Sequence, residues 1–239
     1  MIEELRRNAV LAALRSDALV EVARHAEIRT VRSGEVLYSR DTAFTQAIFP
    51  LDCVVSLMIA EEDRLVEAAS IGREGFVGVA LLFRERRALS SSTVQVSGRA
   101  AFVPMQALEE AFPRFACIQD AMLAYAQRFI AELMVSVSCL RLHRADRRVA
   151  LWLSRAFART GTASIEITHQ ALSEALGLRR ATVTEACLDL QSAGTIDGGR
   201  GWITLCDPEA LAEAACPCHG RLERLHATGA PRLPSHDRS

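Results

Sequence analysis

The stretch that decides the fold is residues 165–190, which read IEITHQALSEALGLRRATVTEACLDL. Thr168 is a favoured residue directly before a helix, because its hydroxyl oxygen can accept a hydrogen bond from a free N–H of the first turn. Leu172 and Leu176 lie four residues apart on one helix face, and Gly177 supplies the positive φ that a sharp turn requires. Two helices joined closely at one glycine are the pattern of a helix-turn-helix.

The second helix of this pair has an apolar inner face, with Val183, Ala186 and Leu190 at helical spacing, and a polar outer face. A recognition helix meets the major groove with its first residues, where arginine can bind guanine and a carboxylate can accept a hydrogen bond from cytosine. The alternative is an ordinary helical hairpin in a packed core. We expect the DNA-binding residues to be Thr168, Gln170, Arg179, Arg180, Thr182, Thr184, Glu185 and, further along, Arg200.

Residues 195–205, TIDGGRGWITL, follow Gly194, a residue suited to the end of a helix. They predict two strands joined by Gly-Gly, with Arg200 near the tip and within reach of a phosphate. Residues 164–167 are expected to add a third strand. The whole segment is therefore predicted to be a winged helix-turn-helix, and nine Arg against six acidic residues in 141–200 agree with a polyanionic partner.

A long helix is predicted before this domain. Pro113 suits a first helical turn, and neither Gly nor Pro occurs from residue 115 to residue 140. Apolar residues follow the alternating three- and four-residue spacing of a coiled-coil seam. We expect a dimerisation helix here, and the alternative is a central core helix of a monomer. The expected seam consists of Phe115, Ile118, Met122, Tyr125, Phe129 and Leu133.

The N-terminal part is predicted to be a helix over residues 4–26 followed by short strands between turn residues, as in an antiparallel sandwich or barrel. The predicted fold class is α+β. The expected divisions are a sensor domain (1–112), a dimerisation helix (113–140), a DNA-binding domain (141–215) and a disordered tail (216–239), where glycine and proline replace the apolar pattern.

Composition and the cysteine pattern indicate where the protein is located and which chemistry it can carry out. Long uncharged apolar runs and a signal peptide are not evident, so we expect a cytoplasmic protein without a membrane span. Convincing catalytic constellations are also not evident, which argues against an enzyme. Seven scattered cysteines do not predict a disulfide framework, and Cys139 and Cys187 are expected to be small core residues. Cys216, Cys218 and His219 are potential metal ligands that lack an obvious partner pair, so we assign no metal site.

The order of these elements resembles that of the Crp/Fnr family of transcription regulators, over nearly the whole chain. The specific matches are residues 33–38 (SGEVLY), 71–78 (IGREGFVG), 147–153 (RRVALWL) and 176–184 (LGLRRATVT). The resemblance implies a β-roll like that of cyclic-nucleotide-binding domains and a homodimer on a palindromic operator in double-stranded DNA. It also implies signalling through the long helix, RNA polymerase as a partner and a base-contacting role for Arg180.

The effector cassette departs from that of cAMP-binding members of the family. Val79 and Ala80 stand where those proteins have Glu-Leu, and residues 88–92 lack the phosphate-binding Arg. Leu133 and Met134, which align roughly with the long-helix positions that face the nucleobase, are apolar. A buried phosphate without a cation is costly, so cAMP is not expected as a ligand. An iron–sulfur cluster is not expected either, since cysteine is absent before Cys53. Arg84, Arg86 and Arg87 are expected to be solvated, with anion binding as the alternative. The alternative function is a ligand- or redox-sensing module without specific DNA binding.

Overall fold

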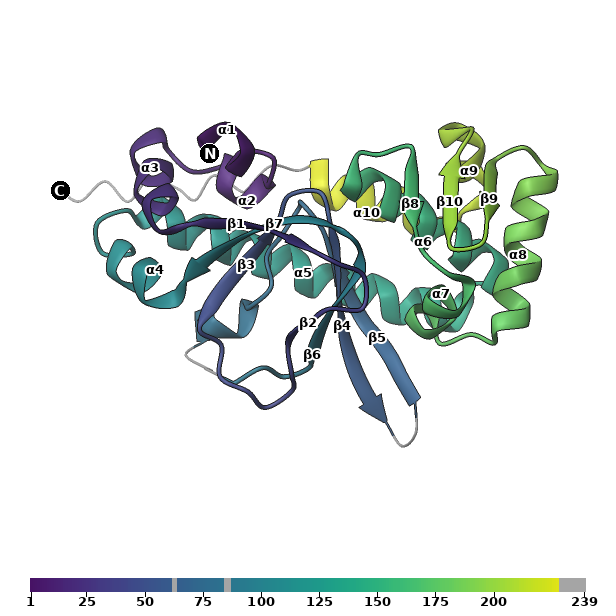
Figure 1. The fold of residues 1–239 in the computed structure, drawn as a ribbon, viewed down its shortest axis with the longest axis horizontal. Coiled ribbons are helices and arrows are strands. Elements are labelled where there is room, and N and C mark those ends of the chain that lie inside the picture. Colours follow the sequence, from purple (N-terminus) through teal and green to yellow (C-terminus); the bar gives the residue numbers. More distant parts are fainter. Residues whose placement is uncertain (62–63, 84–86, 228–239) are drawn as a thin grey trace.

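The computed structural model describes residues 1–61, 64–83 and 87–227 (Figure 1). Arg84, Arg86 and the end of the predicted tail, 228–239, lie outside the described residues. The helices of the N-terminal part are α1 (Ile2–Leu5), α2 (Ala9–Ala12), α3 (Ser16–His25) and α4 (Met105–Ala111), with a short 3-10 helix, η1, at Val79–Phe83.

The single helix predicted over residues 4–26 is wrong, because three helices, α1, α2 and α3, occupy this stretch. Asn8 explains the second start. Its side-chain oxygen accepts hydrogen bonds from the N–H groups of Val10 and Leu11, and its Nδ2 donates to the carbonyls of Pro50 and Gly75. The buried amide thus caps α2 and ties it to the strands, which an apolar periodicity cannot reveal.

The strands of the N-terminal part form two antiparallel sheets, as predicted for the β-roll. One sheet has the order β1-β7-β3 and the other the order β2-β6-β4-β5. Their bounds are β1 (Glu27–Val31), β2 (Val36–Tyr38), β3 (Gln46–Pro50), β4 (Val54–Glu61), β5 (Arg64–Ile71), β6 (Ser91–Val96) and β7 (Gly98–Pro104). The rings of Phe49, Phe76 and Tyr125 stack in their common core, with centroid distances of 5.4 and 5.3 Å, so the long helix closes the roll.

That long helix is α5 (Ala116–Leu142), which runs from the β-roll to the C-terminal domain (Figure 1). Ile118, Met122 and Tyr125 are fully buried in the core of the sensor domain. The expectation that they line a seam to a second subunit is therefore wrong, because their own chain already covers them. Phe115, Phe129 and Leu133 are half-buried. A different face of α5 is exposed, carrying Leu123, Ile130, Met134, Val137 and Leu140.

Among the described helices, α5 is the one whose length and composition would allow it to cross a membrane, and 28% of that apolar stretch is buried in the structure. Its first half packs in the β-roll core and its second half against α10. Packing in the β-roll core accounts for apolar residues of α5 such as Met122 and Tyr125, whereas Ile130 and Met134 remain exposed.

The C-terminal domain contains four further helices besides α10 and a small sheet of order β8-β10-β9. The elements are α6 (Ala145–Thr160), β8 (Ser164–Glu166), α7 (His169–Leu176), α8 (Arg180–Ser192), β9 (Ile196–Gly199), β10 (Trp202–Leu205) and α9 (Pro208–Ala214). The third strand expected beside the hairpin is therefore present as β8, and the α+β fold class is confirmed.

The prediction of a disordered tail from residue 216 is wrong for its first part, where α10 (Cys218–Ala227) packs on α5. Cys216, Cys218 and Leu222 are almost completely buried in the second core. An isolated helix of this length is marginal in water, so packing against α5 and α6 accounts for its order. Sequence periodicity over ten residues does not report such a distant partner.

Candidate nucleic-acid interface and the domain junction

The helix-turn-helix is built as its sequence predicts. The Oγ of Thr168 accepts a hydrogen bond from the N–H of Ala171 at 3.0 Å, which confirms the helix cap. Gly177 has φ +61°, and the N–H of Leu178 donates to the carbonyl of Ser173 at 3.0 Å. Arg148 also donates to the carbonyl of Leu176 at 2.7 Å, so a cation from α6 satisfies the C-terminal end of α7.

The inner face of α8 is buried as predicted, with Val183, Ala186 and Leu190 packed in the C-terminal core. Cys187 lies in the same core, and burial raises the pKa of its thiol to about 11. The predicted role of Cys187 as a small core residue is thus confirmed. Anchoring on this side leaves the opposite face of α8 free to meet a ligand.

Most of the predicted DNA-binding side chains lie on the outer surface of this unit. Thr168, Gln170, Arg179, Arg180, Glu185 and Arg200 are exposed, while Thr182 and Thr184 are half-buried. Neither guanidinium at the start of α8 has a hydrogen bond or ion pair with the described residues, so both remain available to an anion. The side-chain amide of Gln170 donates to the carboxylate of Glu174 at 2.7 Å, so it is held along its own helix.

Thr184 is held by a neighbour that the sequence did not identify. Its Oγ lies 3.0 Å from Nδ1 of His169, at the start of α7. Burial, and then the positive charge of Arg180, lower the pKa of His169 below its usual value. The imidazole is therefore neutral near neutral pH, and it orients Thr184 instead of adding positive charge.

The wing is present, but its turn is not at Gly-Gly. Gly198 and Gly199 lie in β9, and the two-residue turn is Arg200-Gly201, with φ +84° at the second position. A Cβ at Gly199 would lie 2.8 Å from Nε1 of Trp202, which accounts for a glycine within the strand. The shift places Arg200 in the turn itself, at the exposed tip of the hairpin.

A buried ionic cluster at the domain junction was not found from the sequence. Arg159 of α6 lies 2.7 Å from the Glu74 carboxylate and donates to Oγ and the carbonyl of Ser70, at 2.6 and 2.7 Å. Arg155 and His226 contact the Glu132 carboxylate at 2.5 and 3.0 Å. The cluster connects the β-roll, α5, α6 and α10.

The two acidic groups in this cluster titrate abnormally. Burial alone would raise the pKa of Glu132, but the hydrogen bond from His226 and the charges of Arg155 and Arg159 lower that pKa to about 2. Burial likewise opposes ionisation of Glu74, yet Arg159 and Arg155 hold its pKa below the usual value. Both carboxylates are therefore ionised at neutral pH, as the neighbouring cations require.

Glycines explain why the cluster lies at the Gly-rich turn quoted from the sequence, residues 71–78. A Cβ at Gly72 would lie 2.5 Å from Cγ of Arg159, and a Cβ at Gly75 would lie 2.0 Å from Cζ of Tyr125. Close approach, more than backbone freedom, is thus what these positions require. The Gly-rich motif at residues 71–78 was the sequence signal for a close contact at this turn, but it does not reveal that the contacting residue is Arg159.

Comparisons with known proteins agree with this geometry. Residues 147–214 match the family model of the Crp-like helix-turn-helix domain. FixK2 from Bradyrhizobium japonicum has a similar structure, with a TM-score of 0.67 and 18% identity over 80% of this chain and 98% of that one. Among curated protein sequences, none is similar enough to count as a match.

Two further solved structures share the fold. A Crp/Fnr-family transcriptional regulator from Thermus thermophilus has a TM-score of 0.60 and 22% identity, over 79% of this chain and 98% of that one. The c-di-GMP responsive global regulator CLP of Xanthomonas campestris has a TM-score of 0.62 and 15% identity, over 80% and 99%. The resemblance drawn from the sequence is therefore confirmed for the fold: residues 147–214 form a Crp-like helix-turn-helix domain, and the chain as a whole shares the fold of these solved structures.

Proposed function

We propose that this protein is a sequence-specific transcription regulator that acts as a homodimer on a palindromic operator, in the cytoplasm. The observation that carries the proposal is the outward-facing start of α8, where Arg179 and Arg180 are exposed without partners among the described residues. The buried inner face fixes α8 on its domain, so these side chains are presented together. Arg200, on the wing, would then contact a phosphate and set the register.

A binding selection from random duplex DNA, followed by gel shifts with the selected sequence, tests this function. Arg180→Ala should lose about 5- to 150-fold in preference for the selected site over a mismatched one, since a bidentate contact discriminates by about 1–3 kcal/mol. Arg32→Ala is a matched control, because Arg32 is an exposed arginine of the sensor domain. Selection that yields no common sequence, or unchanged preference in Arg180→Ala, would contradict the assignment.

The proposed dimer uses the exposed face of α5. Leu123, Ile130, Met134 and Val137 are exposed there, and with Gln127 they follow an alternating four- and three-residue spacing. This is the spacing of a coiled-coil seam, displaced from the stripe that the β-roll buries. Exposed apolar residues in such a continuous row are typical of a protein interface.

Analytical ultracentrifugation tests this interface. Met134→Glu should convert the dimer to monomer, because each subunit would bury a carboxylate without a counter-charge in an apolar seam. Val36→Glu makes the same kind of change at another exposed apolar residue, on β2, and should leave the dimer intact. A monomeric parent protein, or a Met134→Glu variant that remains dimeric, would contradict the proposed seam.

We also propose that the regulator does not respond to cAMP. Val79 and Ala80 begin η1 and offer no carboxylate, and the nearby Leu81 and Leu82 pack against the sensor core. Calorimetric titration with cAMP should show no saturable binding, and operator affinity should not change when cAMP is added. Saturable binding that strengthens the DNA complex would overturn this part.

A further inference from the structure

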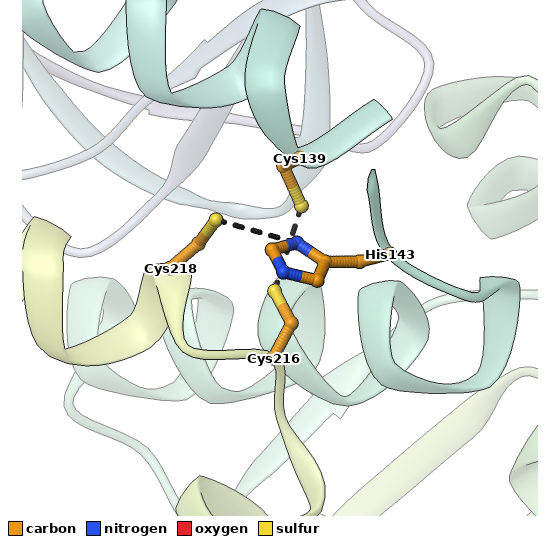
Figure 2. A group of neighbouring side chains, drawn as sticks. All are labelled: Cys139, His143, Cys216 and Cys218. Atoms are coloured by element: carbon orange, nitrogen blue, oxygen red, sulfur yellow. Dashed lines mark hydrogen bonds between the residues drawn. The ribbon is translucent and has the colours of Figure 1, made fainter. Parts of the chain in front are cut away.

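Four potential metal ligands converge where the long helix ends, although they are far apart in sequence. Cys139 lies in the last turn of α5, and His143 caps that helix. Cys216 lies two residues before α10, and Cys218 is the first residue of α10 (Figure 2). The Sγ atoms of Cys139 and Cys216 are 3.5 Å apart, and Sγ of Cys218 is 3.6 Å from Nδ1 of His143. All four ligand atoms lie within 4.8 Å of one another.

The 3.5 and 3.6 Å separations equal edges of one coordination tetrahedron, and the 4.8 Å limit on the remaining pairs leaves a short movement to close the site on an ion. Zinc binds thiolate sulfur at about 2.3 Å and imidazole nitrogen at about 2.0–2.1 Å, which places tetrahedral ligands roughly 3.5–3.8 Å apart. An iron–sulfur cluster places several iron and sulfide ions between its cysteines, so it requires a wider arrangement. The set of three thiols and one imidazole is a known structural zinc set.

The surroundings also favour a structural ion. The side chains of Cys139, Cys216 and Cys218 are almost completely buried, and His143 is half-buried. His143 leaves the helical conformation, with φ −116° and ψ 145°, and Figure 2 shows its ring directed into the group of thiols. Closed coordination by four protein ligands is the arrangement of structural zinc, whereas a catalytic ion keeps an open position.

We propose that Cys139, His143, Cys216 and Cys218 bind a single zinc ion that joins the end of α5 to the start of α10. Binding would release the thiol protons to solvent and connect three segments: α5, the α5–α6 link at His143, and the C-terminal helix. The link at residues 143–144 joins the long helix to the DNA-binding domain. The ion thereby fixes the direction in which that domain leaves α5.

The structure distinguishes between two histidines, His143 and His219, as candidates for the fourth zinc ligand. His219 directly follows Cys218 and is the candidate that the sequence suggests, yet its Nε2 lies 2.9 Å from Oγ of Ser154 and its Nδ1 3.6 Å from Glu223. The imidazole of His219 therefore contacts Ser154 and Glu223 and is not part of the group of thiols. The expected ligand is instead His143, from the other end of the C-terminal domain in sequence.

Metal analysis of the full-length protein, purified from zinc-replete cells without added chelator, is the first test. We expect zinc bound in a one-to-one ratio to the chain. Replacement by cobalt(II) should produce a thiolate-to-metal charge-transfer band and intense visible bands typical of tetrahedral cobalt. Purified protein that contains no zinc and gives no such spectrum when cobalt(II) is added would overturn the proposal. A Cys139–Cys216 disulfide in the purified protein, or a cluster containing acid-labile sulfide, would also overturn it.

Variants identify the ligands. Cys218→Ser and His143→Ala should retain less than about a tenth of the parent's zinc after dialysis against a weak chelator, because each loses a direct ligand. His219→Ala and Cys206→Ser, an exposed cysteine ten residues before Cys216, should retain full zinc. Zinc loss from His219→Ala but not from His143→Ala would overturn the ligand assignment.

Thermal unfolding keeps the test decisive if a variant fails to fold. Stripping zinc from the parent protein should lower its melting temperature by about 10 °C, given occupancy at about a thousand times the dissociation constant and roughly 2–4 °C per kcal/mol. Zinc, but not magnesium, should restore the original value. An unchanged melting temperature after complete removal of zinc would overturn the structural role. These readouts need no DNA, so their failure is distinct from failure of the proposed regulator function.

Discussion

The buried guanidinium of Arg159 offers the sharpest test of how the two domains are held together. Its side chain is 6% exposed and lies 2.7 Å from the Glu74 carboxylate, with two hydrogen bonds to Ser70. Arg159→Met keeps most of the side-chain volume and removes the charge. The Glu74 carboxylate, also largely buried, then loses its main counter-charge, and the Ser70 carbonyl loses its donor.

The expected cost follows from this burial. Removing one partner of a buried ion pair costs about 3–5 kcal/mol, because the remaining charge stays desolvated without compensation. At roughly 2–4 °C per kcal/mol for a chain of this size, Arg159→Met should lower the melting temperature by about 6–20 °C. An exposed pair gives the comparison. Arg144 lies 3.3 Å from Asp146 with its side chain 85% exposed, so Arg144→Met should change stability by less than about 0.5 kcal/mol.

Urea unfolding followed by circular dichroism measures both variants. Glu74→Gln and the double variant Arg159→Met/Glu74→Gln complete a double-mutant cycle, and the double variant should be less destabilised than the sum of the single variants. If Arg159→Met unfolds at the same urea concentration as the parent, or if the cycle is additive, then Arg159 and Glu74 do not stabilise the junction as a pair.

Three further predictions concern the same molecule. The pKa of Glu132, lowered to about 2 from its usual 4.5, should contribute about 3 kcal/mol of stability above pH 4.5 that is lost as the pH falls toward 2; Glu132→Gln should remove this acid dependence in unfolding measured from pH 5 to pH 2. Gly75→Ala should destabilise the sensor domain by about 1–3 kcal/mol, because the new Cβ would collide with the Tyr125 ring; a thermal melt as stable as the parent's would refute the close approach. Arg200→Ala should weaken DNA binding equally for all sequences and reduce the slope of log affinity against log salt by about 1; an unchanged slope would mean that the wing makes no phosphate contact there.

The exposed face of α5 shows where reasoning from the sequence reached its limit. The apolar residues of α5 occupy most sides of the helix, so more than one stripe along it has coiled-coil spacing. Ile118, Met122 and Tyr125 fit that spacing, yet the β-roll covers them, and the row through Ile130 and Met134 is left exposed. The choice depends on which side of the helix the roll packs against, and that contact is not encoded in the periodicity of α5.

The sequence by itself determined the helix-turn-helix, the strands of the roll and the long helix. The signals for these, such as the Thr168 cap and the turn at Gly177, act between residues that are close along the chain. Only the tertiary structure decided the Arg159 junction, the order of α10 and the group around Cys139 and Cys216, which are 77 residues apart. Such contacts depend on how separate elements pack, and a local pattern of side chains carries no information about a distant partner.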